Sequence, residues 1–293
     1  MSDRSSNAGT RETEHTHEPA DESTDAVVEA NGGSTDEAIA PLEVSELRKE
    51  FGGVTAVDGV SFSVDRGSLT GLIGPNGAGK STTFNCITGV YTPDGGTVRF
   101  DGEDITGLSP HRIATKGLVR TFQIARELKE MTVLENLMLA PQTQSGESLL
   151  RSVAPRLRQR VKSEERRQVE RVWETLEFFE IDHLAHEHAG NLSGGQRKLL
   201  ELARVLLTDP SVVLLDEPMA GVNPTLERKL LDRIEALVAE GYTFLLVEHD
   251  MDVIMDHCET VIVMHQGRNL RTGPPEEIQE SERVIDAYLG GGG

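Results

Sequence analysis

Polar residues dominate the first 40 positions of the chain. Serine, threonine, aspartate, glutamate, asparagine and glycine are frequent there, and almost no large apolar residue precedes Ile39. Such a segment cannot bury enough apolar surface to offset the entropy that it would lose on ordering. We therefore expect residues 1–40 to form a disordered acidic tail.

Short apolar runs begin at Leu42. Runs typical of β-strands, with glycine and aspartate between them, occupy residues 60–64, 69–73 and 97–100. This pattern favours an antiparallel β region. Farther along, strands are predicted at 212–215, 243–247 and 260–264, and helices at 225–240 and 250–256. Continuous apolar strands that alternate with helices indicate a parallel sheet covered on both faces.

The middle of the chain has a different pattern. Residues 132–207 contain no good strand, but they show helical periodicity at 132–139 and 163–179. We expect a helical subdomain at about 130–207, inserted into one α/β domain that spans residues 41–290. Residues 291–293, all glycine, would be a flexible end.

The composition is strongly acidic. Among 293 residues, 49 Asp and Glu oppose 29 Lys and Arg, and the formal net charge is -20. This excess argues against a nucleic-acid partner held by a general basic field, because phosphate binding needs clustered cations. Only seven of the basic residues are lysine. An acidic surface with few lysines suggests the hypothesis of adaptation to high salt, and an ordinary acidic cytosolic protein is the alternative.

Three further features concern the cellular location. No run of about 18 apolar residues exists, so no transmembrane helix is expected. The first 30 residues lack the apolar stretch of a secretory signal. Cys86 and Cys258 are too few for a disulfide framework and have no spacing for zinc, so we expect two thiols in the core or at its boundary, in a reducing compartment.

The strongest candidate for chemistry is a glycine-rich loop between an apolar strand and a helix-compatible stretch at 81–88. It fits the pattern G-x-x-x-x-G-K-[ST], in which backbone N–H groups surround phosphate oxygens. Lys80 would reach the β- and γ-phosphates, and the Ser81 hydroxyl would bind Mg²⁺. A chance match in a glycine-rich turn is the alternative. The predicted nucleotide-binding residues of this loop are Gly74, Pro75, Asn76, Gly77, Ala78, Gly79, Lys80, Ser81 and Thr82.

Two acids, Asp216 and Glu217, follow the apolar strand at 212–215. The end of this strand would bring them to the same rim as the phosphate-binding loop. Asp216 suits the coordination shell of Mg²⁺, and Glu217 suits a general base that orients or deprotonates the attacking water. Solvated acids at the end of a strand are the alternative interpretation.

A third motif comes before an apolar-periodic helix at 198–207. Its serine would cap the helix, and the first N–H groups of the helix would form a second anion site. One protein rarely needs two phosphate sites for one nucleotide, so the arrangement makes sense if the second site serves the nucleotide of another subunit. A turn followed by a helix is the alternative. The motif consists of Leu192, Ser193, Gly194, Gly195 and Gln196.

The three motifs together resemble those of ATP-binding-cassette (ABC) ATPases, and the resemblance extends from Leu42 to Leu289. It implies a P-loop NTPase fold with a mixed RecA-like parallel sheet core, an antiparallel β subdomain and an inserted helical subdomain. Gln123 matches the family's Q-loop residue, which touches Mg²⁺ and water. His249 matches the switch histidine, which contacts the γ-phosphate and Glu217. Phe51 matches the aromatic residue that stacks on adenine. A structural histidine and an ordinary phenylalanine are the alternatives.

Residues 120–128 and 131–140 and the end of the chain, 273–289, resemble the larger ATPase of branched-chain amino-acid importers. Urea and short-amide importers share these features. Asn223 stands where many ABC proteins carry aspartate. The ATPases of branched-chain amino-acid importers share this asparagine, in the sequence Ala-Gly-x-Asn-Pro. Residues 151–171 hold eight basic residues against three acids, which indicates either a solvated helix face or a surface near anionic lipid or membrane subunits.

The resemblance also implies ligands and partners. ATP and Mg²⁺ would bind the site. The partners would be membrane-spanning permease subunits, a second ABC ATPase subunit paired head-to-tail with this one and, indirectly, a solute-binding protein. The chain would then lie on the cytoplasmic face of the cell membrane. A soluble ABC ATPase of translation or DNA repair and a P-loop kinase or other regulatory NTPase are the alternatives from other classes.

Overall fold

The computed structural model describes residues 39–121, 128–140 and 155–289. These residues belong to one compact unit, Ile39–Gly293. The predicted tail, apart from residues 39 and 40, and the predicted glycine end lie outside the described ranges. Within those ranges, no helix has both the length and the apolar character needed to cross a membrane.

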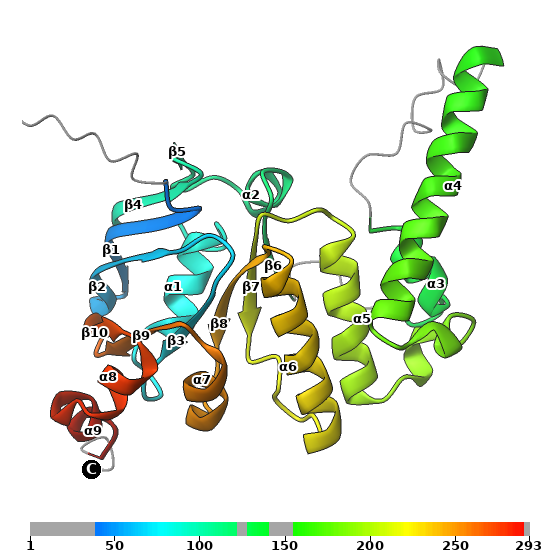
Figure 1. Ribbon diagram of the computed structural model, residues 1–293. Coiled ribbons are helices and arrows are strands. Elements are labelled where there is room, and N and C mark those ends of the chain that lie inside the picture. Colours follow the sequence, from blue (N-terminus) through cyan, green and yellow to red (C-terminus); the bar gives the residue numbers. More distant parts are fainter. Residues whose placement is uncertain (1–38, 122–127, 141–154, 290–293) are drawn as a thin grey trace, which may run out of the picture. The chain divides into compact units, whose positions relative to one another are not determined.

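The largest sheet has six strands (Figure 1). From β9 to β6 each strand pairs in parallel with its neighbour, and β10 pairs antiparallel with β9 at one edge. The predicted mixed sheet is therefore confirmed, as are the strands at 212–215, 243–247 and 260–264. In spatial order the strands are β10 (Arg268–Gly273), β9 (Thr260–His265), β3 (Leu69–Ile73), β8 (Thr243–Val247), β7 (Val212–Asp216) and β6 (Leu118–Arg120).

Assigning residues 69–73 to the antiparallel region was wrong. They form β3, which lies inside the six-stranded sheet between β9 and β8. All five residues of β3 are buried, which is typical of a central parallel strand with both faces covered. The burial of the whole segment, Thr70 and Gly71 included, follows from its central place in the sheet, whereas the neighbouring glycines and aspartates suggested an antiparallel region.

Side chains of the main sheet point alternately into two separate cores. On β7, Val213 and Leu215 join one core, and Val212 and Leu214 join the other. The same alternation holds along β8 and β9, because successive side chains of a strand point to opposite faces. Both faces of the sheet are therefore buried, as predicted.

A four-stranded antiparallel sheet and the helix α1 contribute to the second of these cores. Apolar alternation predicted the strands at 60–64 and 97–100 but missed β1. A bulge between Val44 and Leu47, with Glu46 at φ 50°, breaks the alternation there. The elements are β2 (Val54–Val64), β1 (Leu42–Phe51), β4 (Gly95–Phe100), β5 (Glu103–Asp104) and α1 (Lys80–Ile87).

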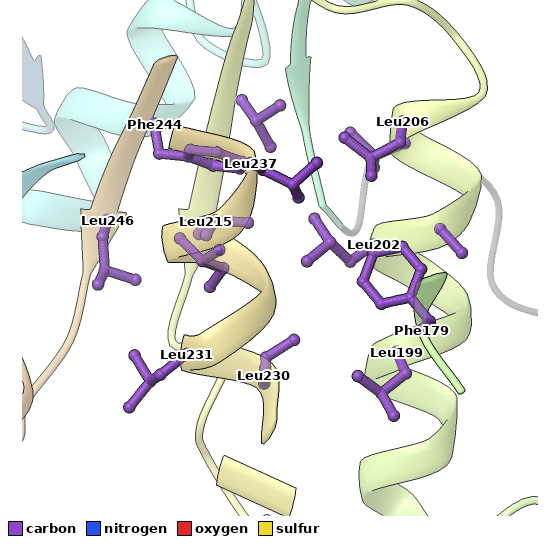
Figure 2. Close-up of a cluster of buried hydrophobic side chains, with 14 of the residues drawn as sticks. Phe179, Leu199, Leu202, Leu206, Leu215, Leu230, Leu231, Leu237, Phe244 and Leu246 are labelled. Carbon is purple, nitrogen blue, oxygen red and sulfur yellow. The ribbon is translucent and has the colours of Figure 1, made fainter. Parts of the chain in front are cut away.

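Helices fill the first core on the other face of the main sheet. Figure 2 shows leucines of α5 and α6 together with Phe179 and side chains of β7 and β8. Complete burial of each leucine or phenylalanine contributes about 1.5–3 kcal/mol. The helices of the second half of the chain are α5 (Gly194–Leu206), α6 (Pro224–Ala239), α7 (Met251–His257), α8 (Pro275–Gln279) and α9 (Glu282–Leu289).

The elements described between β6 and β7 are helical. Residues 155–162 lack the apolar spacing that predicted a helix from residue 163, but arginine, glutamine and lysine are good helix formers, and α4 begins at Pro155. Both cysteines are buried, as expected. The remaining elements are α2 (Pro110–Thr115), α3 (Val133–Met138), α4 (Pro155–Phe178) and the short 3-10 helices η2 (Asp182–Leu184) and η3 (Ala189–Asn191).

Candidate nucleotide site

A cleft of about 310 Å³ opens at the carboxyl end of the main sheet, within the size range of small-molecule sites. Ligands of open α/β sheets bind at this end of the strands. The loop between β3 and α1 and the first turn of α1 supply most of the lining. Ala56 of β2, the acid after β7 and the histidine after β8 supply the rest. In the part of the chain that the structure describes, the lining residues are Ala56, Asn76, Gly77, Ala78, Gly79, Lys80, Ser81, Thr82, Glu217 and His249.

Two glycines allow the tight path of this loop. Gly74 has φ 151°, and a Cβ there would clash with the carbonyl oxygen of Met264. Gly79 has φ 101°, and its Cβ would lie 2.5 Å from the carbonyl oxygen of Ala56. Other residues rarely adopt this backbone conformation, so glycine is required twice. The loop then leads directly into α1, whose first N–H groups have no partner within the helix.

Lys80 is nearly buried, with 6% of its surface exposed. Its Nζ donates hydrogen bonds to the carbonyl oxygens of Gly74 at 2.6 Å and Pro75 at 3.2 Å. Burial lowers the pKa of Lys80, and the negative charges of Glu217 and Asp216 oppose that shift. The charged amine of Lys80 therefore lies across the loop, where it can donate hydrogen bonds to an anion held by the loop.

Glu217 and His249 face each other at this cleft. Their side chains lie 2.6 Å apart, between His249 Nε2 and Glu217 Oε1. Glu217 has φ 48°, a conformation that is rare for residues other than glycine and that often occurs at functional sites. The backbone N–H of Glu217 donates to the carbonyl oxygen of Val247 at 2.8 Å, which links the ends of β7 and β8.

Asp216 is the last residue of β7 and forms an ion pair with Arg120 at the end of β6. Arg120 also donates to Asn85 Oδ1 of α1 at 2.7 Å. The guanidinium thus joins three elements around the cleft.

Ser81 at the start of α1 offers a hydroxyl, and Asp216 offers a carboxylate. Both are the hard oxygen ligands that Mg²⁺ prefers, so these side chains suit a magnesium ion.

The segment 192–196 lies apart from the residues that line the cleft, among those the structure describes. Ser193 is the N-cap of α5, as predicted: its side chain accepts from the N–H of Gln196 at 3.3 Å, and Gln196 Oε1 accepts from the N–H of Ser193 at 2.8 Å. Gly195 packs closely against Leu226 of α6, where a Cβ would clash. The exposed Ser193 and Gly194 are therefore presented on a second surface of the unit.

The predictions for Phe51 and Gln123 have a different outcome from the others. Phe51 ends β1 with 43% of its surface exposed, and its ring lies edge-on to Tyr91 with centroids 5.1 Å apart. It is not one of the described cleft-lining residues. Gln123 lies outside the described residues. The stacking role and the Q-loop role therefore stay predictions.

Sequence reasoning missed three side chains around the site. Ala56 lines the cleft, Arg120 binds Asp216, and Glu248 accepts hydrogen bonds from the backbone N–H groups of Met219 and His249. The sequence held one clue to Glu248, because this acid directly follows a mostly apolar strand and directly precedes the candidate histidine His249. Ala56 and Arg120 carried no signal, since their roles depend on how distant strands meet.

The comparisons with known proteins give one consistent family. A family model described as "ABC transporter" matches residues 57–220, and a second, "Branched-chain amino acid ATP-binding cassette transporter", matches residues 272–293. The chain is 44% identical to the "Probable branched-chain amino acid transport ATP-binding protein LivG" of Archaeoglobus fulgidus. That alignment covers 85% of this chain and 95% of the relative.

Two further proteins agree with these matches. The chain is 41% identical to the "High-affinity branched-chain amino acid transport ATP-binding protein LivG" of Escherichia coli, over 85% of this chain and 97% of the relative. A solved nucleotide-free ATP-binding cassette of an ABC transporter superposes with a TM-score of 0.72 at 38% identity, and 85% of this chain and 99% of that chain are covered. The predicted fold is thus confirmed, and the chain belongs to the ATP-binding cassette family of ABC transporter subunits.

Proposed function

We propose that this chain powers the import of branched-chain amino acids, with Glu217 as the general base for ATP hydrolysis. The observation that supports the catalytic part is the 2.6 Å contact between Glu217 and His249 at the edge of the phosphate-binding cleft. The solute is supported by the printed names of the relatives and by the match at residues 272–293. Nothing in this subunit would contact the solute.

Water would attack the γ-phosphorus of ATP in line with the leaving group. Glu217 would accept the proton of the attacking water, and His249 would orient Glu217 and contact the γ-phosphate. Lys80 would leave the carbonyl oxygens of its own loop and bind phosphate oxygens. Its charge and the loop N–H groups would stabilise the negative charge of the transition state.

Ser81, Asp216 and Gln123 would hold Mg²⁺, which would neutralise part of the phosphate charge. Arg120 would keep Asp216 oriented through their ion pair. Phe51 would stack on adenine beside Tyr91. These assignments use the residues at the rim of the main sheet and add Phe51 and Gln123, whose roles are predictions from the sequence.

A second ATPase subunit would complete each site. Residues 192–196 of one subunit would close over the ATP held by the loop 74–82 of the other, in a head-to-tail pair. The exposure of Ser193 and Gly194 away from the subunit's own cleft supports this arrangement. Gln123 and the proposed helical subdomain, about residues 130–207, would pass the movement on to permease subunits. The chain would thus lie at the cytoplasmic face of the membrane, with residues 1–40 as a disordered tail.

The catalytic part is tested with Glu217→Gln. The amide keeps the shape of the side chain but cannot accept the proton, so ATP binding should persist while hydrolysis falls by about two orders of magnitude or more. ATP binding is measured by calorimetry, and turnover by phosphate release. Unchanged turnover would reject Glu217 as the base.

The solute is tested by uptake in cells with and without the gene. Loss of leucine, isoleucine and valine uptake is expected, with restoration by the intact gene and no restoration by Glu217→Gln. If urea or acetamide uptake is lost instead, the chain serves the alternative importer class. Co-purification with multi-spanning membrane proteins is expected in either case and would be missing for a soluble ABC ATPase.

A further inference from the structure

A buried glutamate lies directly beside the histidine of the site. Glu248 follows β8, a strand whose five residues are all buried, and only 6% of its own surface is exposed. A buried carboxylate is costly unless hydrogen bonds satisfy it. Its contacts therefore identify what it does in the fold.

Both carboxylate oxygens of Glu248 accept backbone hydrogen bonds. Oε1 accepts from the N–H of Met219 at 2.8 Å, and Oε2 accepts from the N–H of His249 at 3.2 Å. Met219 is two residues beyond Glu217. One side chain thus joins the loop after β7, which carries the acid, to the loop after β8, which carries the histidine.

Charged groups from three elements face this carboxylate. Burial raises the pKa of Glu248, and the two backbone donors oppose the shift. Glu217 raises the pKa further, and His249 lowers it. Lys198 comes from α5, the helix that Ser193 caps. Burial lowers the pKa of Lys198, while the charges of Glu201 and Glu248, among others, raise it.

The side chains of Glu217 and His249 are only partly packed against the rest of the protein. The side chain of Glu217 is 39% exposed and that of His249 is 49% exposed. Their separation of 2.6 Å must therefore be set by the backbone positions of the two loops. An error of about 1 Å in such a geometry can cost about a hundredfold in rate.

We propose that Glu248 is a positioning residue that holds the loops of Glu217 and His249 in register for hydrolysis. This inference rests on the catalytic roles proposed above for Glu217 and His249. A carboxylate is suited to the task because each of its oxygens can accept from a different loop. No single neutral side chain of the same length offers two such acceptors on separate atoms.

The test compares two substitutions of Glu248. Glu248→Gln keeps the size but leaves one oxygen acceptor, so one of the two loops loses its bond. Glu248→Met keeps a similar length and removes both acceptors. We expect kcat for ATP hydrolysis to fall about tenfold for glutamine and further for methionine, while the KM for ATP stays within about twofold.

Thr243→Val is the matched control for a purely structural role. Thr243 lies at the other end of β8, is 1% exposed, and accepts a backbone hydrogen bond from Gly67 at 2.9 Å. Its loss should lower the melting temperature and leave kcat unchanged. If Glu248→Gln behaves in the same way as this control, the proposal is overturned. Should Glu248→Met fail to fold, the glutamine variant decides.

A double mutant tests whether Glu248 acts through the histidine. In a His249→Ala background the geometry that Glu248 maintains no longer matters, so adding Glu248→Gln should cost less than about twofold. Full multiplication of the two losses would overturn the proposal. Glu217→Gln is measured in parallel. If it keeps wild-type turnover, the proposed function fails. If it is inactive while Glu248→Gln is normal, only the role of Glu248 fails.

Discussion

Substitutions of Ser193 separate two roles that this side chain combines. Its hydroxyl caps α5 by accepting from the N–H of Gln196, and it is also the group proposed to contact the ATP of the opposite subunit. Ser193→Ala removes both functions. Ser193→Asp keeps the cap, because aspartate is among the best N-cap residues and its charge suits a helix N-terminus, but it places a carboxylate against phosphate.

Stability and turnover should rank the serine, alanine and aspartate proteins in different orders. Loss of the cap costs about 1 kcal/mol, which lowers the melting temperature by about 2–4 °C in a domain of this size. With a total stability of about 5–15 kcal/mol, the alanine variant still remains more than about 99% folded. Turnover should fall about tenfold for alanine through the lost hydrogen bond to phosphate, and at least about a hundredfold for aspartate through charge repulsion.

Urea unfolding gives the stabilities, and phosphate release by the assembled subunits gives the turnover. The order of stability should be serine close to aspartate and above alanine, whereas the order of turnover should be serine, alanine, aspartate. Thr132→Ala is the control, because Thr132 forms the same type of capping box on α3 with Glu135. It should lose stability and keep turnover. Aspartate at wild-type turnover would refute the role of Ser193 in binding ATP.

Two other outcomes follow from the structure and a third from the composition. Arg120→Gln should lower the free energy of unfolding by about 2 kcal/mol in urea, because it leaves the partly buried Asp216 without its partner. The control Arg66→Gln, which breaks an exposed ion pair with Asp101, should change the free energy of unfolding by less than about 0.5 kcal/mol. Burial raises the pKa of Cys86 to about 11 and that of Cys258 to about 12, so both thiols should resist alkylation at pH 8 in the folded protein and react only on unfolding; fast labelling of either one contradicts its burial. Stability and turnover should rise as KCl increases into the molar range, and a maximum in dilute buffer would reject adaptation to high salt.

Periodicity predicted the fold wherever each strand or helix has a regular apolar face. The three strands predicted in the second half occur as predicted, because their central residues are apolar and buried on both sides. β1 was missed since the bulge at Glu46 interrupts its alternation, and β6 was missed since three residues are too few to show any period. The helix α5 began four residues earlier than its apolar pattern, because glycines can fill its capped first turn.

The site was less predictable than the fold, and for a physical reason. A motif of consecutive residues, such as the loop 74–82, shapes its own surface, and its residues 76–82 line the cleft, whereas Gly74 and Pro75 are not among the described lining residues. The ion pair between Arg120 and Asp216 and the two hydrogen bonds of Glu248 depend instead on how the ends of β6, β7 and β8 are aligned in the sheet. No local spacing of residues encodes this alignment, because the packing of the whole sheet determines it.

The net charge of -20 has to be reconciled with a polyanionic substrate. At an ionic strength of 1 M the screening length is about 3 Å, so surface carboxylates farther away exert almost no force on ATP. At 0.01 M the length is about 30 Å, and the whole acidic surface would repel the nucleotide. Within the site, Asp216 and Glu217 add negative charge beside Lys80, and the loop N–H groups oppose it. Salt would therefore remove the long-range repulsion and leave the short-range attraction at the cleft, where bonded groups exclude screening ions. An acidic surface and the binding of ATP are compatible in this protein because the long-range repulsion and the contacts in the cleft act over different distances.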